Sequence, residues 1–113
     1  MEASVRTRQI DATTYRIALA GEIDICTSPE FRDDLRSCIQ RGASEVLVDL
    51  SAATFIDSTF LGILIGGVKL IRERGGEINV VCPDSIRNIF ELTGLDHVLA
   101  ITEAPAAVAE PVA

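Results

Sequence analysis

From residue 28 onward, short apolar runs of strand length alternate with segments whose apolar residues recur at helical spacing. Parallel strands need a crossover between them, and a helix usually supplies it. Two earlier runs, Ser4 to Ile10 and Thr14 to Ala20, are separated by the turn-like Asp11-Ala12-Thr13 and predict an antiparallel β-hairpin. The predicted fold class is therefore α/β, with an opening β-hairpin and a mixed, mainly parallel β-sheet flanked by helices.

Three further strands are expected after the hairpin. Val46 to Leu50 is an apolar run of the kind found in strands covered on both faces. Ile78 to Cys82 is a second run, which ends at Pro83, and Val98 to Ile101 is the last. Hydrophobic residues make up 48% of the chain and few of them are aromatic, so we expect aliphatic side chains to fill the core.

Capping residues and glycines mark the helices between these strands. A Thr-x-x-Glu sequence has the form of a capping box, and an aspartate before the second helix offers an N-cap carboxylate. The expected helices run from Thr27-Ser28-Pro29-Glu30 to Gly42, from Asp57-Ser58 to Gly75-Gly76, and from Asp84 or Ser85 to Gly94.

Length and charge limit the domain count and the partners. The 113 residues suffice for one domain, expected over residues 1–102, and the Ala- and Pro-rich tail 103–113 is expected to be a short helix or disordered. Ten Lys and Arg against 17 Asp and Glu give a net charge of −7, which repels nucleic acid and anionic lipid. We therefore expect no direct nucleic-acid partner. No membrane partner is expected either, because the longest apolar stretch is too short to span a bilayer.

Little in the sequence indicates catalysis. The three cysteines are widely spaced without a C-x-x-C motif, so they predict neither a disulfide framework nor a zinc site, and a reducing cytoplasm is the expected location. The polar N-terminus lacks the apolar region of a signal peptide, which also favours the cytoplasm as the expected location. The chain has one histidine, His97, and no phosphate-loop, dinucleotide or nucleophile-elbow motif. We expect no catalytic residue, no cofactor and no metal.

The triplet Asp57-Ser58-Thr59 is the most informative polar feature. If Asp57 is the N-cap, both hydroxyls lie in the first helical turn, where backbone N–H groups lack partners. That end of a helix tolerates added negative charge, because the helix dipole favours anions by about 0.3 to 1 kcal/mol. The triplet could accept a phosphate, or it could be only a helix cap.

The helix after this triplet carries more apolar surface than one contact needs. One of its two apolar stripes would pack on the sheet. The other could be covered by a neighbouring helix or remain exposed for a partner. The stripes consist of Leu61, Leu64, Ile65, Val68 and Ile71, and of Phe60, Ile63, Gly67 and Leu70.

Four segments stand in the order Gly21-Glu22-Ile23-Asp24, Val48-Asp49-Leu50-Ser51, Phe55-Ile56-Asp57-Ser58-Thr59 and Leu92-Thr93-Gly94-Leu95. Together they resemble the STAS family, the sulfate-transporter and anti-sigma-factor-antagonist domain, over about residues 4 to 102. The Asp-Ser-Thr element is the specific signal. The sequence most resembles stand-alone bacterial anti-sigma factor antagonists, which bind an anti-sigma factor that is also a Ser/Thr kinase.

The resemblance implies a role for each matching residue. Ser58 is the implied phosphoacceptor, Asp57 its flanking carboxylate and Thr59 a neighbouring hydroxyl, while Asp24 lies in the partner-facing region. The unmodified protein would bind the kinase, phosphorylation would weaken the complex, and a phosphatase would reverse it.

This chain has Phe60 where the family usually has Gly. We expect its ring to be partly exposed beside Ser58 and, together with Ile63, to contact the partner. The sequence is also compatible with two other functions. One is a STAS scaffold subunit of a transport or sensory assembly without a phosphoryl switch. The other is a small hydrolase with Ser58 as nucleophile and His97 as base, which parallel topology opposes because these residues would lie at opposite ends of the sheet.

Overall fold

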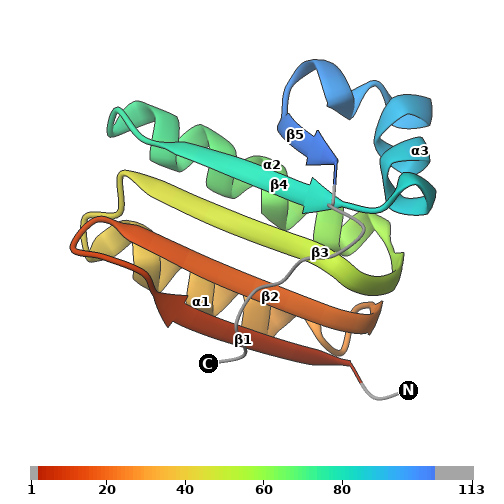
Figure 1. Ribbon diagram of the computed structural model, residues 1–113, viewed down its shortest axis with the longest axis horizontal. Helices are drawn as coiled ribbons and strands as arrows, with labels where there is room; N and C mark the ends of the chain where they lie inside the picture. The colour runs from red at the N-terminus through yellow and green to blue at the C-terminus, as the bar shows by residue number, and fades with distance from the viewer. Residues whose placement is uncertain (1–2, 104–113) are drawn as a thin grey trace.

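The computed structural model describes residues 3–103. They form a five-stranded sheet in the order β1-β2-β3-β4-β5, in which β1 is antiparallel to β2 and the other neighbouring strands are parallel (Figure 1). The α/β fold with an opening hairpin is therefore confirmed. The elements are β1 (Ser4–Gln9), β2 (Thr14–Ile23), α1 (Ser28–Gln40), β3 (Glu45–Ile56), α2 (Ser58–Glu73), β4 (Glu77–Cys82), α3 (Asp84–Thr93), the 3₁₀ helix η1 (Leu95–His97) and β5 (Ala100–Glu103).

The strands at the centre of the sheet are longer than their apolar runs. β3 continues past Leu50 to Ile56, and β2 continues to Ile23, because the two strands keep pairing to the register Ile23 with Ile56. Hydrogen bonding between strands thus extends the sheet beyond the apolar stretch. At the other end of the chain, η1 displaces the last strand, so β5 begins two residues later than predicted. The predicted tail lies outside the described residues except for Glu103.

The helices begin within one residue of their predicted starts, but two of the three predicted N-terminal caps are wrong. Each helix ends within two residues of its predicted glycine. The predicted capping box of α1 is wrong, because the Thr27 side chain makes no cap hydrogen bond. Asp84 and Ser85 do not cap α3 either, since Pro83 occupies its N-cap position and leaves Asp84 in the first turn. Among the described residues, no helix is long and apolar enough to cross a membrane.

The core lies between the sheet and the two helices α1 and α2, which lie behind the sheet in Figure 1. Alternate residues of the strands point toward these helices and are buried, as strand geometry requires. The two helices contribute one buried stripe each. The inward strand residues include Ile17, Leu19, Val46, Val48, Leu50, Ile78 and Val80, and the helices contribute Phe31, Leu35, Ile39, Phe60, Leu64, Val68 and Ile71.

The opposite face of the sheet carries an ion pair. The Arg16 guanidinium donates to the Asp49 carboxylate, and Ser51 donates to it through both its backbone N–H and its hydroxyl. On this face Asp49 is buried and Leu47 is half-buried, so the second face of β3 is covered only in part. Burial by itself raises the pKa of Asp49, but the hydrogen bonds from Ser51 and Arg16 outweigh it and hold that pKa below its ordinary value.

Asp49→Asn should lower the free energy of unfolding at pH 7 by about 2 to 4 kcal/mol, because Arg16 loses its buried counter-ion. The pKa of Asp49 is lower in the folded protein than its value of about 3.9 in the unfolded chain, so the carboxylate stabilises the fold above about pH 3.9. This stabilisation is lost as the pH falls through the pKa of the folded protein. The stability gap between wild type and variant should therefore narrow below about pH 4. Urea denaturation at several pH values checks this, and a gap that does not change with pH would contradict it.

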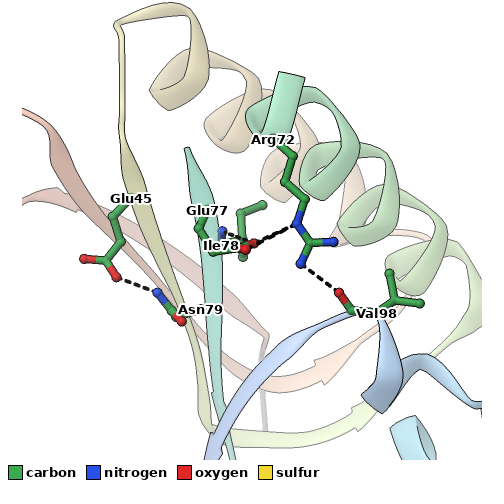
Figure 2. A network of polar contacts seen from close by, with 6 residues as sticks. All are labelled: Glu45, Arg72, Glu77, Ile78, Asn79 and Val98. Carbon is green, nitrogen blue, oxygen red and sulfur yellow. Dashed lines mark hydrogen bonds and ion pairs between the residues drawn. The ribbon is translucent and has the colours of Figure 1, made fainter. Parts of the chain in front are cut away.

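A polar network fixes the C-terminal end of α2 (Figure 2). Arg72 in the last turn donates from Nε to Glu77 at 3.1 Å, and its guanidinium also donates to the Val98 carbonyl at 2.8 Å. Asn79 on β4 donates to Glu45 on β3 in the same region. The end of α2 is thus tied to the start of β4 and to the segment before β5.

Candidate functional site

The candidate site lies at the carboxyl edge of the parallel strands. Ile23 ends β2 and Ile56 ends β3, and these two residues are register partners. The residues that follow them, Asp24 and Asp57, therefore leave the sheet side by side. Sequence segments more than thirty positions apart meet here because of this pairing, as is usual for sites at the carboxyl ends of α/β strands.

Asp57 caps α2 as predicted. Its backbone is extended, with φ −115° and ψ 180°, and its Oδ1 accepts the backbone N–H of Phe60 at 3.0 Å. Ser58 and Thr59 follow in the first turn and are exposed. The Ser58 hydroxyl makes no hydrogen bond to any residue between 3 and 103, so it faces solvent at a helix end that favours negative charge.

Asp24 organises the loop between β2 and α1. Its carboxylate accepts the backbone N–H of Cys26 at 2.9 Å, and its carbonyl accepts the N–H of Ser28 at 2.9 Å. The Thr27 hydroxyl, which was expected to cap α1, lies 3.4 Å from the same carboxylate. The structure therefore gives Asp24 a loop-forming role and leaves Ile25, at the tip of the loop, exposed.

The expectation that Phe60 is partly exposed is wrong. Its side chain has 0% exposure, and its ring centroid lies 4.8 Å from that of Phe31 on α1. The buried stripe of α2 begins with this ring and continues through Leu64 and Val68 at intervals of four residues. Phe60 therefore joins the first turns of α1 and α2 and cannot serve as a surface contact.

The exposed aromatic side chain at this edge is Phe55, which opens the segment Phe55-Ile56-Asp57-Ser58-Thr59 and has no predicted role. It is 47% exposed at the end of β3, where its register partner on β2 is Glu22. Ile25 in the neighbouring loop is 68% exposed. Strand alternation provided a signal for this side chain, because Ile56 is buried and its neighbour must point to the other face.

A groove of about 410 Å³ lies between α1 and α2. Its walls are partly apolar, and its charged lining residues are both arginines of α1. Ile63, predicted as a partner contact, lines this groove and is half-buried. The second apolar stripe of α2 is therefore partly covered by a neighbouring helix and partly open. The residues that line the groove include Arg32, Arg36, Ser58, Thr59, Gly66 and Gly67.

Gly66 and Gly67 should respond in opposite ways to substitution by Ala. A Cβ on Gly67 would lie 2.3 Å from Cδ2 of the buried Leu35, so we expect Gly67→Ala to destabilise the fold by about 1 to 2 kcal/mol. A Cβ on Gly66 meets nothing within 4 Å, and Gly66→Ala should stabilise α2 by up to about 1 kcal/mol through helix propensity. The urea denaturation midpoints of the two variants measure both changes in stability. A Gly67→Ala midpoint equal to or above that of the wild type would show that close packing of α1 on α2 does not depend on Gly67.

The hydrolase hypothesis does not fit this geometry. His97 lies in η1 next to Val98, whose carbonyl binds Arg72 in the last turn of α2. Ser58 begins the same helix, about 20 Å away at 1.5 Å per residue. Within residues 3–103, no group of three or more His, Cys, Asp or Glu side chains is placed to hold a metal ion.

The buried thiols are poor nucleophiles as well. Burial raises the pKa of both Cys38 and Cys82 to about 11, so neither is a thiolate at neutral pH.

Comparison with known proteins identifies the family. Residues 7–108 match the family model described as Mlab, STAS domain. The chain belongs to the STAS domain family. This confirms the resemblance that was based on four motifs. The STAS domain is also 31% identical over 99 residues to an anti-sigma-B factor antagonist of Staphylococcus aureus, a match that covers 83% of this chain and 92% of that protein.

Two solved structures have the same fold as this chain. The unphosphorylated form of the anti-sigma factor antagonist SpoIIAA is similar with a TM-score of 0.80, at 19% identity over 91% of this chain and 90% of that one. The phosphorylated form of the Bacillus cell fate determinant SpoIIAA gives a TM-score of 0.74, also at 19% identity, over 91% and 93% of the two chains. At these identities the two solved structures show a shared fold, and the Staphylococcus aureus relative is named an anti-sigma-B factor antagonist.

Proposed function

We propose that this STAS domain is an anti-sigma factor antagonist that binds an anti-sigma factor kinase while Ser58 is unmodified. Phosphorylation of Ser58 weakens the complex, and a phosphatase restores the binding form. The observation that carries the proposal is the exposed Ser58 hydroxyl, one residue after a formed Asp57 cap. The names of the relatives support the antagonist function, and the phosphorylated form of a protein with this fold supports the modification.

The switch acts through local charge. A phosphate adds about −1.5 to −2 charges at neutral pH. At the N-terminus of α2 the helix dipole and free N–H groups accept this charge, so the fold should change little. A partner surface that covers Ser58 must remove the phosphate from water beside the Asp57 carboxylate, and that desolvation opposes binding.

Incubation with the anti-sigma factor kinase of the same genome and ATP tests the modification. We expect one phosphate per chain, located at Ser58 by mass spectrometry and absent from Ser58→Ala. Thr59→Ala is the matched control, because Thr59 is exposed in the same helical turn and should not be needed. Phosphate that remains in Ser58→Ala would place the modification elsewhere. No phosphate on the wild type would favour the scaffold alternative.

Phe55→Ala should lower the affinity for the kinase by about tenfold or more, because its exposed ring lies near the end of β3, three residues before Ser58 in sequence, and is suited to become buried in the complex. Calorimetric titration measures the affinity. Leu92→Ala is the control, since Leu92 is 87% exposed but belongs to the last turn of α3, a different element from β3 and α2. Equal affinity of the Phe55→Ala variant and the wild type would show that the contact surface does not include this ring.

A further inference from the structure

We propose that Arg32 and Arg36 of α1 bind the phosphate of phosphorylated Ser58 within the same molecule. The inference rests on the proposed function, because it concerns the modified form of Ser58. The observation behind it is that both guanidinium-bearing side chains line one groove together with Ser58 and Thr59. No other charged side chain lines that groove.

The fold brings these side chains together from two helices. α1 follows β2 and α2 follows β3, and because the two strands are parallel, both helices begin at the same edge of the sheet. The ring contact between Phe31 and Phe60 fixes their first turns against each other. Arg32 directly follows Phe31, and Ser58 lies two residues before Phe60. A side chain as long as arginine can therefore reach across the groove entrance.

Arg36 is the second positively charged residue of α1 that lines the groove. It lies four residues after Arg32, so both side chains are on one face of α1. Two adjacent guanidinium groups offer forked N–H donors that match the oxygens of a phosphate, and such charge-assisted pairs are stronger than neutral hydrogen bonds.

Neither arginine is strongly held by another group. Arg36 makes no hydrogen bond or ion pair with any residue between 3 and 103. Arg32 lies 3.7 Å from the Asp33 carboxylate, but both side chains are exposed, and such a pair contributes little. Arg72 and Arg74, in contrast, are engaged by Glu77 and by a backbone carbonyl. The two groove arginines are available for a new anion.

A phosphate on Ser58 would lie near acidic groups, and the two arginines can offset the resulting repulsion. Asp57 adjoins Ser58 and would repel a phosphate, although its Oδ1 accepts the Phe60 N–H. Asp24 in the neighbouring loop points its carboxylate toward the Cys26 N–H. The arginines offset the repulsion from these carboxylates. A phosphate held between α1 and α2 also covers the groove entrance and neutralises its positive charge. Modification would thereby change the groove surface as well as the charge at Ser58.

The test uses the full chain with phosphoserine installed at position 58 by genetic encoding, so that no kinase is needed. The second pKa of the phosphate is measured by ³¹P NMR titration. An adjacent pair of guanidinium groups favours the dianion, so this pKa should lie below the usual value of about 6. In Arg32→Ala/Arg36→Ala it should rise by at least about half a pH unit, since the favourable charges are gone.

Matched variants make the result specific. Arg87→Ala removes a partly exposed arginine of α3 that does not line the groove, and should leave the phosphate pKa unchanged. Arg32→Lys/Arg36→Lys keeps the positive charges but lacks the forked N–H donors of guanidinium. The second pKa of the phosphate in this variant should lie between those of the wild type and the double Ala variant. Thermal melts verify that every variant is folded. An unchanged pKa in the double Ala variant overturns the proposal. That outcome is distinct from failure of the proposed function, which shows as absence of kinase-dependent phosphate on Ser58.

Discussion

Ser58→Asp is expected to reduce the affinity of the STAS domain for its anti-sigma factor kinase by about 100-fold or more, while Ser58→Ala retains wild-type affinity. A carboxylate at Ser58 stands in for part of the phosphate charge and lies beside Asp57, so a covering partner must bury two neighbouring negative charges. An uncompensated buried charge weakens binding by about 2 to 5 kcal/mol. A 100-fold loss of affinity corresponds to about 2.7 kcal/mol, which lies within this range. Isothermal titration calorimetry of the two purified proteins gives the affinities directly.

Thr59→Asp is the control for this result. It adds the same charge one residue further along the exposed turn of α2. A smaller loss of affinity than in Ser58→Asp would show that position, as well as total charge, governs binding. If Ser58→Asp binds the kinase as tightly as the wild type, phosphorylation cannot act by charge at this site and the proposed switch is wrong.

Phe60→Ala should lower the free energy of unfolding by about 3 to 5 kcal/mol, because its ring is fully buried against Phe31. Phe60→Gly should be worse by about 1 kcal/mol, from the lower helix propensity of Gly in the first turn of α2. A domain of this size has only about 5 to 15 kcal/mol of stability, so either change removes a large part of it. Urea denaturation followed by circular dichroism measures the loss.

Phe55→Ala is the matched control for burial. It removes the same ring from a position that is 47% exposed, and its effect on stability should be about 1 kcal/mol or less. Equal destabilisation of Phe60→Ala and Phe55→Ala would contradict the packing described for Phe60. Phe60 is thus part of the core and does not belong to the surface around Ser58.

The sequence by itself determined the class of fold and the chemistry of the helix start. Alternating strand and helix periods require crossovers, and these imply a parallel sheet in which successive strand ends share an edge. The resemblance to the STAS family assigned Asp24 to the partner-facing region, and the register of Ile23 with Ile56 places Asp24 beside Asp57. The Asp57 cap was also predictable, because an Asp before an apolar helix supplies a local acceptor for the free N–H groups of the first turn.

The tertiary structure alone decided which side chains of the site are buried and which are exposed. The two apolar stripes of α2 are indistinguishable by period, and Phe60 became core because α1 places Phe31 opposite it. The prolonged pairing of β2 and β3 carried Phe55 to the surface. The groove that joins Ser58 to Arg32 depends on how closely α1 packs against Gly67. Periodicity reports which faces of an element are apolar, but only contacts between elements far apart in sequence decide which face is covered.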